Sequence, residues 1–268
     1  RQMCIRDSYK MVKIFADHDY EVTVYPTRAR LDCTRKVLED AGRFDLVVCC
    51  GGDGTLNEMV SGMMQRQDRR PMGYIPLGST NDLAVSLRLP TRVEEAALRA
   101  VTGNEFHMDV GTLNDRYFNY IAAFGAFTET SYATPQEIKN ALGHLAYILE
   151  GVKSLGKILP IHVKITADDE QFEEDYLFGA VTNTISLAGV LKLDPEKVLL
   201  DDGMYELLLV KNPTNALEAQ AMLTAIMTQN FDGPLVKMFH ASDITFESSH
   251  EILSLIHISE PTRHAQIS

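Results

Sequence analysis

Two segments rich in glycine, hydroxyl and carboxylate groups are the residues of this chain best suited to chemistry. The first reads Gly-Gly-Asp-Gly-Thr-Leu-Asn-Glu over residues 51–58 and stands between an apolar run and a helical pattern. Glycine lets a backbone approach a ligand closely, and the N–H groups of a first helical turn favour an anion such as a phosphate chain. Asp53 would repel that phosphate unless a divalent cation lay between them, so the charges predict magnesium. The alternative is a tight turn in which Asp53 and Thr55 cap the helix.

The second segment reads Pro-Leu-Gly-Ser-Thr-Asn-Asp-Leu-Ala over residues 76–84 and follows the next predicted strand. In an open α/β sheet, ligands bind at the carboxyl ends of the strands, so both segments are expected to face one cleft. The first segment has neither the dinucleotide-binding nor the P-loop spacing. Together the two loops predict a nucleotide site of another type.

Alternating strand and helix patterns position these loops in the first half of the chain. Period-2 or continuous apolar runs predict strands at residues 20–25, 45–50 and 72–76. Helical spacing predicts helices at residues 33–41 and 56–67. A strand, a helix and a strand at this spacing indicate a right-handed crossover, and therefore an α/β domain with a parallel sheet.

The second half changes to hairpin patterns, which predict a β-rich, antiparallel and sandwich-like domain. Its expected strands cover residues 106–113, 116–121, 161–166, 172–181, 205–210 and 244–247. Helices are expected from about residue 135 and over residues 215–229. A boundary near Gly103 then gives a nucleotide-binding α/β domain at residues 9–103 and a β-rich domain at residues 104–252.

Composition excludes several classes of protein. Of the 268 residues, 45% are hydrophobic, which is enough for a packed core. The net charge of −12, from 37 acidic and 25 basic residues, argues against nucleic acid as a partner. No apolar run approaches the roughly 20 residues of a membrane span, so membrane contact is expected to be peripheral. The four cysteines lack metal-ligand spacing, which fits a reducing cytoplasm without a disulfide framework.

The two ends of the chain resemble translated sequencing-library DNA. Residues 3–8 read Met-Cys-Ile-Arg-Asp-Ser, and residues 253–258 read Leu-Ser-Leu-Ile-His-Ile. Opposite strands of one DNA element, similar to a transposon mosaic end, can encode both peptides; the alternative is a coincidence of two short peptides. We therefore expect residues 1–8 and 253–268 to be adapter-derived tails around a fragment truncated at both sides.

The motifs resemble the catalytic domain of the diacylglycerol kinases, specifically the soluble bacterial lipid kinases of that family. The resemblance rests on Gly-Gly-Asp-Gly-Thr followed by Pro-x-Gly-(Thr/Ser)-x-Asn-Asp, and it continues through residues 108–111, 116–119 and 200–204. It implies an enzyme that uses ATP and Mg²⁺ to phosphorylate diacylglycerol or a related lipid alcohol. The implied location is the cytoplasm, with transient contact at the inner face of the membrane.

The resemblance implies that residues 9–103 form the ATP-binding domain and residues 104–252 the lipid-substrate domain. It also assigns roles to individual residues. Those expected to contact ATP are Thr27, Gly51, Gly52, Asp53, Gly54, Thr55, Leu56, Asn57, Glu58, Gly78, Ser79 and Asn81. Asp53, Asp82 and Asp109 match the acidic trio that organises the catalytic magnesium near the phosphates. The alternatives are a helix N-cap for Asp82 and a strand-end turn for Asp109.

A second, structural magnesium site is implied in the later domain. Its ligands would be the Asp202 carboxylate and the carbonyls of Met204 and of Leu199 or its neighbour, since such oxygens suit this cation. A plain Asp-Gly turn is the alternative. Two family motifs are missing: an Asn-Pro-x-(Ser/Ala)-Gly loop before Tyr9, and an Asp-Gly-Glu after Ile252 whose Glu acts as general base. We therefore expect weak or absent turnover from this chain even where nucleotide binds.

Other functions remain open at this point. An NAD kinase shares the Gly-Gly-Asp-Gly-Thr motif, although residues 76–82 favour the lipid branch, and a non-catalytic nucleotide-binding protein is a third alternative. Residues 138–159 mix apolar side chains with Lys139, Lys153 and Lys157, which suits either a membrane interface or a helix packed on the core. A homodimer is an open alternative.

Overall fold

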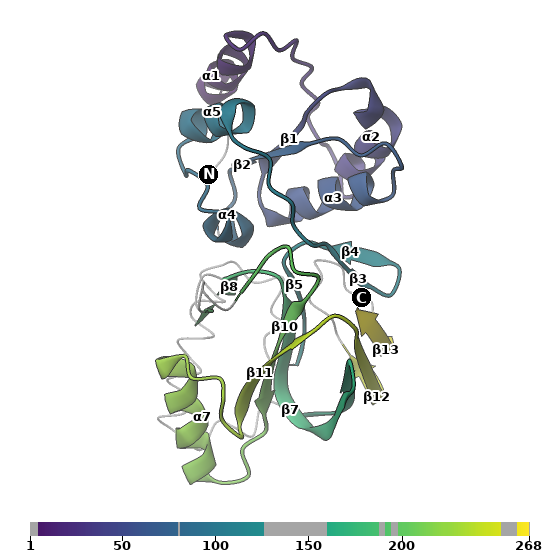
Figure 1. Ribbon diagram of the computed structural model, residues 1–268, viewed down its shortest axis with the longest axis vertical. Helices are drawn as coiled ribbons and strands as arrows, with labels where there is room; N and C mark the ends of the chain where they lie inside the picture. The colour runs from purple at the N-terminus through teal and green to yellow at the C-terminus, as the bar shows by residue number, and fades with distance from the viewer. Residues whose placement is uncertain are drawn as a thin grey trace. The chain divides into compact units, whose positions relative to one another are not determined.

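The computed structural model describes residues 5–79, 81–125, 160–187, 191–193, 198–252 and 262–267. The chain divides into two compact units, residues 1–107 and residues 108–268 (Figure 1). The boundary expected near Gly103 lies shortly before this division. The helix expected from residue 135 and the stretch 138–159 lie outside the described residues.

The first unit is built on a parallel pair of strands joined by a helix. Strand β1 (Val47–Gly51) runs beside β2 (Met72–Pro76), with Gly51 opposite Pro76 at their carboxyl ends, and α3 (Asp53–Met64) connects them. The other helices of this unit are α1 (Ile5–Ala16), α2 (Asp32–Asp40), the short η1 (Ala41–Arg43), α4 (Asp82–Ser86) and α5 (Val93–Thr102). The expected strand–helix–strand crossover is therefore confirmed, and both glycine-containing loops leave the same edge of the sheet.

The spacing of apolar residues along these helices explains which face of each helix is packed in the core. Leu56, Met59, Val60 and Met63 recur every three or four residues of α3 and are all buried, so this face of the helix is its packing face. The helices α1 and α5 are packed together in a core around Phe15, with Ile75 of β2 also a member. The buried face of α3 thus fixes this helix within the first unit.

The strand expected at residues 20–25 is wrong. Residues 20–28 have no strand pairing, and the side chain of Val24 is 67% exposed. An alternating pattern orients side chains, but a strand also needs a neighbouring backbone to hydrogen-bond. The β1–β2 sheet offers this segment no pairing among the described residues, and it forms an extended connection to α2 instead.

The second unit is dominated by a sheet with antiparallel pairing, which confirms the α/β fold class with a β-rich second part. Its strand order is β11-β10-β7-β6-β12-β13-β3-β4, and β5 also pairs with β7. The strands are β3 (Gly111–Leu113), β4 (Arg116–Phe118), β5 (Ile121–Gly125), β6 (Ile161–Ala167), β7 (Glu170–Thr182), β10 (Tyr205–Lys211), β11 (Val236–Ala241), β12 (Ile244–Ile252) and β13 (Thr262–Ile267). A separate pair is formed by β8 (Ser186–Leu187) and β9 (Leu191–Lys192).

Strand β7 is long enough to join two parts of this sheet. Its first half pairs with β6, and its second half, from Tyr176 onward, pairs with β10 and β5 (Figure 1). Val163, Ile165 and Leu207 are fully buried in the core that these strands enclose. The expected hairpins around residues 114–115 and 168–169 are both present.

Helix α7 (Ala216–Thr228) covers the other face of β10 and β11, where Met222 packs in a core with Leu208 and Val236. It begins as expected at Asn215, whose side chain accepts a hydrogen bond from the Glu218 N–H at 2.9 Å. Among the described residues, no helix has the length and apolar composition needed to cross a membrane.

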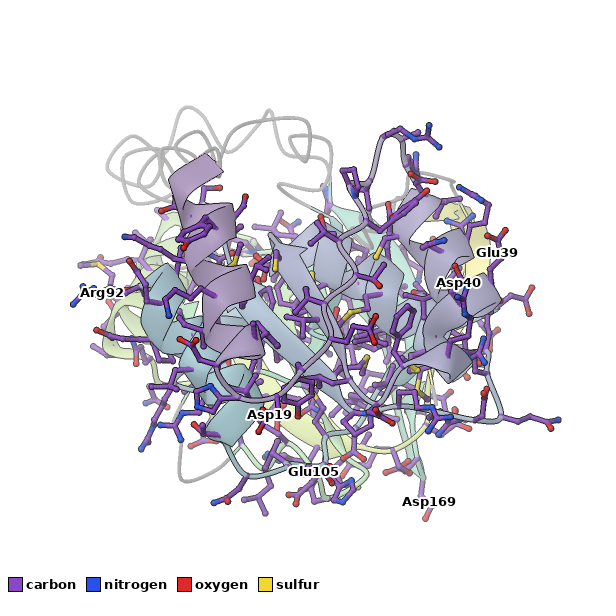
Figure 2. All side chains as sticks on the ribbon, turned by 90° about the horizontal axis from the view of Figure 1, so that it is seen from above. Asp19, Glu39, Asp40, Arg92, Glu105 and Asp169 are labelled. Carbon is purple, nitrogen blue, oxygen red and sulfur yellow. The ribbon has the colours of Figure 1, made fainter. Side chains whose placement is uncertain are left out.

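Many charged side chains lie on the outside of each unit, as Glu39 and Arg92 of the first and Asp169 of the second illustrate (Figure 2), whereas Asp32, Asp82 and Glu206 are buried. Two elements include residues expected to be adapter-derived: α1 begins at Ile5, and β13 pairs with β12 and β3. The origin of these residues in library DNA stays a prediction.

Candidate active site

The two glycine-containing loops touch through their backbones. A Cβ added to Gly78 would lie 2.7 Å from the Cα of Gly52, and one added to Gly52 would lie 3.2 Å from the Cα of Gly78. The loops are also tied by the Leu77 N–H, which donates to the Gly51 carbonyl at 2.8 Å. A side chain at either glycine would force the loops apart.

The start of α3 faces open space. Its N-cap is Gly52, which has no side chain to cap the first amides, so the alternative of Asp53 and Thr55 as N-caps is not what forms. A Cβ added to Gly54 would meet nothing within 4 Å. The Thr55 side chain leans back on Gly51, 2.8 Å from where that residue's Cβ would be. The first amides of a helix, together with the positive end of the helix dipole, are suited to phosphate.

Two carboxylates lie near Tyr74. Asp53 is the first residue of α3, and Asp82, 1% exposed, is the first residue of α4. Burial and then the charge of Asp53 raise the pKa of the Tyr74 phenol far above its ordinary value, and Cys49 and Asp82 add to the effect. Asp82 is not the cap of α4, because that position belongs to Asn81 in a left-handed conformation. Asp53 and Asp82 therefore act on one shared region of the first unit.

This donor set fits magnesium that arrives with phosphate. Mg²⁺ is usually held by one or two carboxylates together with substrate phosphates and waters. Asp53 and Asp82 supply two carboxylates, and the described residues contain no cluster of three or more His, Cys, Asp or Glu that could hold a metal alone.

Two of the expected nucleotide ligands, Asn81 and Leu56, have side chains engaged in the structure of the unit itself. Asn81 Oδ1 accepts from the Gly78 N–H at 2.9 Å and from the Tyr74 hydroxyl at 3.1 Å, while its Nδ2 donates to the Gly78 carbonyl at 2.8 Å. The Leu56 side chain is buried in the core, so only its backbone remains for a ligand. Asn57 is half-buried, whereas Ser79 is exposed at the loop. Their contacts with nucleotide stay predictions.

Asp109 belongs to the second unit, apart in the chain from Asp53 and Asp82. Its N–H donates to the Leu200 carbonyl at 2.8 Å, and its Oδ2 accepts from the Gly203 N–H at 2.6 Å. Asp109 is therefore joined directly to the turn expected to bind the second magnesium.

That turn offers oxygen donors of the expected kind. Asp202 Oδ1 accepts from the Met204 N–H at 3.0 Å, which holds the carboxylate over the turn. The Leu200 carbonyl also accepts from Asn183 Nδ2 at 3.1 Å, so its two lone pairs are used. Of the two neighbouring carbonyls, Leu199 is thus the one suited to a cation, and the magnesium site itself stays a prediction.

Comparisons with known proteins agree with this geometry. The profile described as the diacylglycerol kinase catalytic domain matches residues 5–113. A protein named diacylglycerol kinase from Staphylococcus saprophyticus subsp. saprophyticus is 33% identical over 230 residues, which cover 85% of this chain and 75% of that protein. The chain belongs to the diacylglycerol kinase family.

Other members of the diacylglycerol kinase family support the same assignment. The Bacillus subtilis (strain 168) protein of that name is 37% identical over 204 residues, which cover 75% of this chain and 67% of that protein. A crystal structure of a candidate diacylglycerol kinase from Bacillus anthracis str. Sterne matches with a TM-score of 0.80 at 26% identity, over 98% of this chain and 88% of that one. A further structure from that organism, at 22% identity and a TM-score of 0.75, supports the fold alone. The chain is thus a lipid kinase, and membership of a kinase family implies ATP.

Two side chains of this diacylglycerol kinase family member were not singled out by their sequence patterns. Tyr74 holds Asn81 beside the two carboxylates, and Asn183 donates to the Asp109 and Leu200 carbonyls. Their positions in the sequence could have indicated a role in the site, because each is a polar residue at the end of an apolar strand. Tyr74 lies near the end of β2, and Asn183 directly follows β7. Such positions point side chains at the loops that carry the site.

Proposed function

We propose that the product of the whole gene transfers the γ-phosphate of ATP to the hydroxyl of diacylglycerol or a related lipid alcohol, with Mg²⁺. This chain, whose sequence contains no Asp-Gly-Glu, is expected to bind nucleotide with weak or absent turnover. The observation that carries this proposal is the start of α3, where Gly52 is the N-cap, Gly54 borders open space and Gly52 touches Gly78. The relatives that share most of the chain are named diacylglycerol kinase, which supports this acceptor over NAD.

Each group at the start of α3 has a distinct duty in this proposal. The amides of the first turn of α3 bind the phosphate oxygens, since backbone N–H groups and the helix dipole are fixed before the ligand arrives. Asp53 and Asp82 would hold magnesium, which neutralises phosphate charge when bound. Tyr74 keeps Asn81 and its loop in place through the 3.1 Å hydrogen bond. Phosphoryl transfer needs mainly such positioning and charge neutralisation.

The lipid acceptor would be reached at the membrane surface. We propose a cytoplasmic protein that contacts the inner face of the membrane transiently and peripherally. The net charge of −12 gives it no general attraction to an anionic bilayer, so the lipid itself would have to supply the affinity. The same charge disfavours nucleic acid, and a homodimer stays an open prediction.

A radiolabelled ATP assay on the product of the whole gene tests this function. We expect transfer of the labelled phosphate to diacylglycerol in mixed micelles, with none after magnesium is removed by chelation. NAD in place of the lipid serves as the competing acceptor. Phosphorylation of NAD but not of any lipid alcohol would overturn the proposal.

A further inference from the structure

The side chain of Glu58, in α3, binds the start of α2. Its Oε1 accepts from the Leu31 N–H at 2.9 Å and its Oε2 from the Cys33 N–H at 3.3 Å, both at the start of α2. Its carbonyl accepts from the Thr34 hydroxyl at 2.8 Å. Both carboxylate oxygens of Glu58 are therefore engaged with α2.

Helix α2 needs such a cap from outside. Leu31 is its N-cap, with φ 63° and no capping side chain of its own. The first amides of a helix lack intrahelical partners, and a negative charge beside them is stabilising. Glu58 supplies both the acceptors and the charge across the α2–α3 interface.

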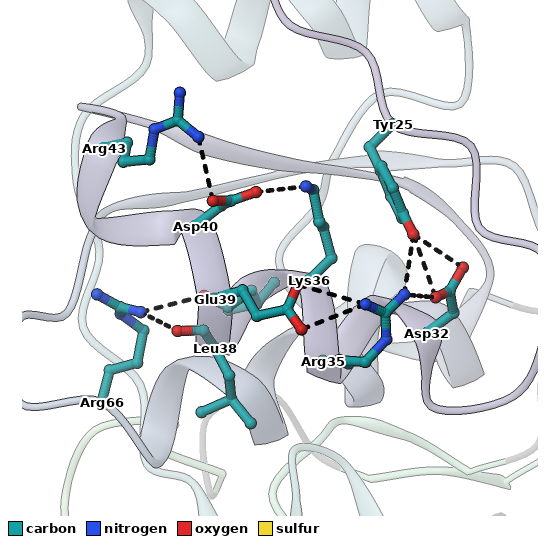
Figure 3. A network of polar contacts seen from close by, with 10 residues as sticks. Tyr25, Asp32, Arg35, Lys36, Leu38, Glu39, Asp40, Arg43 and Arg66 are labelled. Atoms are coloured by element: carbon teal, nitrogen blue, oxygen red, sulfur yellow. Dashed lines mark hydrogen bonds and ion pairs between the residues drawn. The ribbon is translucent and has the colours of Figure 1, made fainter.

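The loop before α2 is fixed by a second set of contacts. Asp32 accepts from the Arg28 N–H at 3.0 Å and from the Tyr25 hydroxyl at 3.2 Å, and it pairs with the guanidinium of Arg35 (Figure 3). Asp32 is only 8% exposed, so these contacts form a built network. Thr27 is exposed and lies between the two anchored residues Tyr25 and Arg28.

These two sets of contacts make one mechanical path. Asp32 ties the Thr27 loop to α2, and Glu58 ties α2 to the second turn of α3. Helix α3 in turn begins at Asp53 beside the glycine contact. The position of Thr27 relative to the start of α3 is therefore set through Glu58.

We infer that Glu58 is a positioning residue, which holds the Thr27 loop in register with the phosphate-binding start of α3, and not itself a nucleotide ligand. This inference rests on the proposed function, because it assigns Thr27 to the same nucleotide site. A carboxylate facing the nucleotide would repel its phosphates, whereas one bonded to two amides adds no such cost.

A double-mutant cycle on the affinity for ATP with Mg²⁺ tests this inference. Thr27→Ala removes one charge-assisted hydrogen bond from the Thr27 hydroxyl to phosphate, and Glu58→Gln displaces that hydroxyl. We therefore expect each variant to raise the Kd for ATP by about tenfold. Introduced into Thr27→Ala, Glu58→Gln should add less than about twofold, since the two residues act as a unit. Multiplication of the two effects would show that Glu58 contacts nucleotide independently of Thr27 and would overturn the inference.

Hydrogen exchange in the nucleotide-free protein distinguishes a positioning role from direct contact with nucleotide. If Glu58 only contacted nucleotide, its substitution would not change amide exchange in the absence of nucleotide. Glu58→Gln should speed exchange at the Leu31 and Cys33 amides. The matched control is Glu39→Gln, an exposed carboxylate of α2 bonded to Arg35, which should leave both exchange and Kd unchanged. Should Glu58→Gln not fold, Glu58→Asp enters the same cycle.

Different results would refute the proposed kinase function and the positioning role of Glu58. Wild-type protein that binds no ATP would refute the proposed function. Wild-type protein that binds ATP, with the same Kd and the same Leu31 and Cys33 exchange rates in Glu58→Gln, would refute only the positioning role of Glu58.

Discussion

Gly54→Ala should separate nucleotide binding from folding. Gly54 is the second residue of α3, and a Cβ built there meets no atom within 4 Å. Alanine therefore fits the nucleotide-free protein without displacing a neighbour. Since alanine favours a helix over glycine, the variant should be more stable than wild type by about 0.5–1 kcal/mol.

The same methyl group occupies the space from which phosphate would reach the amides of α3. Losing one hydrogen bond to a charged group costs about 1.5–3 kcal/mol, which corresponds to a Kd for ATP raised about 10- to 100-fold. Calorimetric titration with ATP and Mg²⁺ measures the affinity, and urea unfolding measures the stability of the same sample.

Gly103→Ala is the control, at the end of α5 in the same unit. Its Cβ would lie 2.5 Å from the Arg99 carbonyl oxygen, so it should destabilise the fold by about 1–3 kcal/mol. Because this contact lies outside the α2–α3 interface, the affinity of the folded fraction for ATP should stay at the wild-type value. A Gly54→Ala variant that binds ATP as tightly as wild type would refute the placement of phosphate at the start of α3.

Two further predictions concern stability and pH. Leu31→Gly should raise the free energy of unfolding by about 1 kcal/mol in a urea titration, because it relieves the left-handed backbone at φ 63°, whereas Leu38→Gly in the same helix should lower it. The His162 ring lies 2.8 Å from an Asp175 oxygen and 3.4 Å from a Glu173 oxygen, and these carboxylates, Asp175 first, raise its pKa above the ordinary 6.5. The stabilisation from this raised pKa is present below pH 6.5 and disappears as pH rises through the raised value. In an NMR titration, Asp175→Asn should lower the His162 pKa more than Glu173→Gln does, and an equal or reversed effect would contradict the geometry.

Local sequence patterns predicted the strands correctly where the folded chain supplies a neighbouring strand to pair with. The apolar run before Gly51 and the residues 72–76 became β1 and β2, since each strand has the other to pair with. Asn215 capped α7 because its cap is a contact within one turn. Residues 20–25 show an alternating strand pattern but have no strand pairing, because a pattern along the chain does not tell whether a neighbouring strand is present.

The site was predictable as a pair of loops and not as a set of contacts. The glycines at 52 and 78 revealed close backbone approach through their residue type alone. The side-chain duties of Glu58 and Asn81 depend on atoms brought close only by the folded chain, such as the Leu31 amide, 27 positions from Glu58, and the Tyr74 hydroxyl. Motif resemblance grouped both residues with the nucleotide ligands because it records position in a motif and not hydrogen-bond partners.

The most direct test of the central claim is a titration of glycine-selectively ¹⁵N-labelled protein with ATP and Mg²⁺. We expect saturable shifts of the Gly52, Gly54 and Gly78 amide signals, with Gly103 and Gly233 as internal references that stay unchanged. Saturable ATP binding that leaves the signals of Gly52, Gly54 and Gly78 in place would contradict a phosphate site at the start of α3.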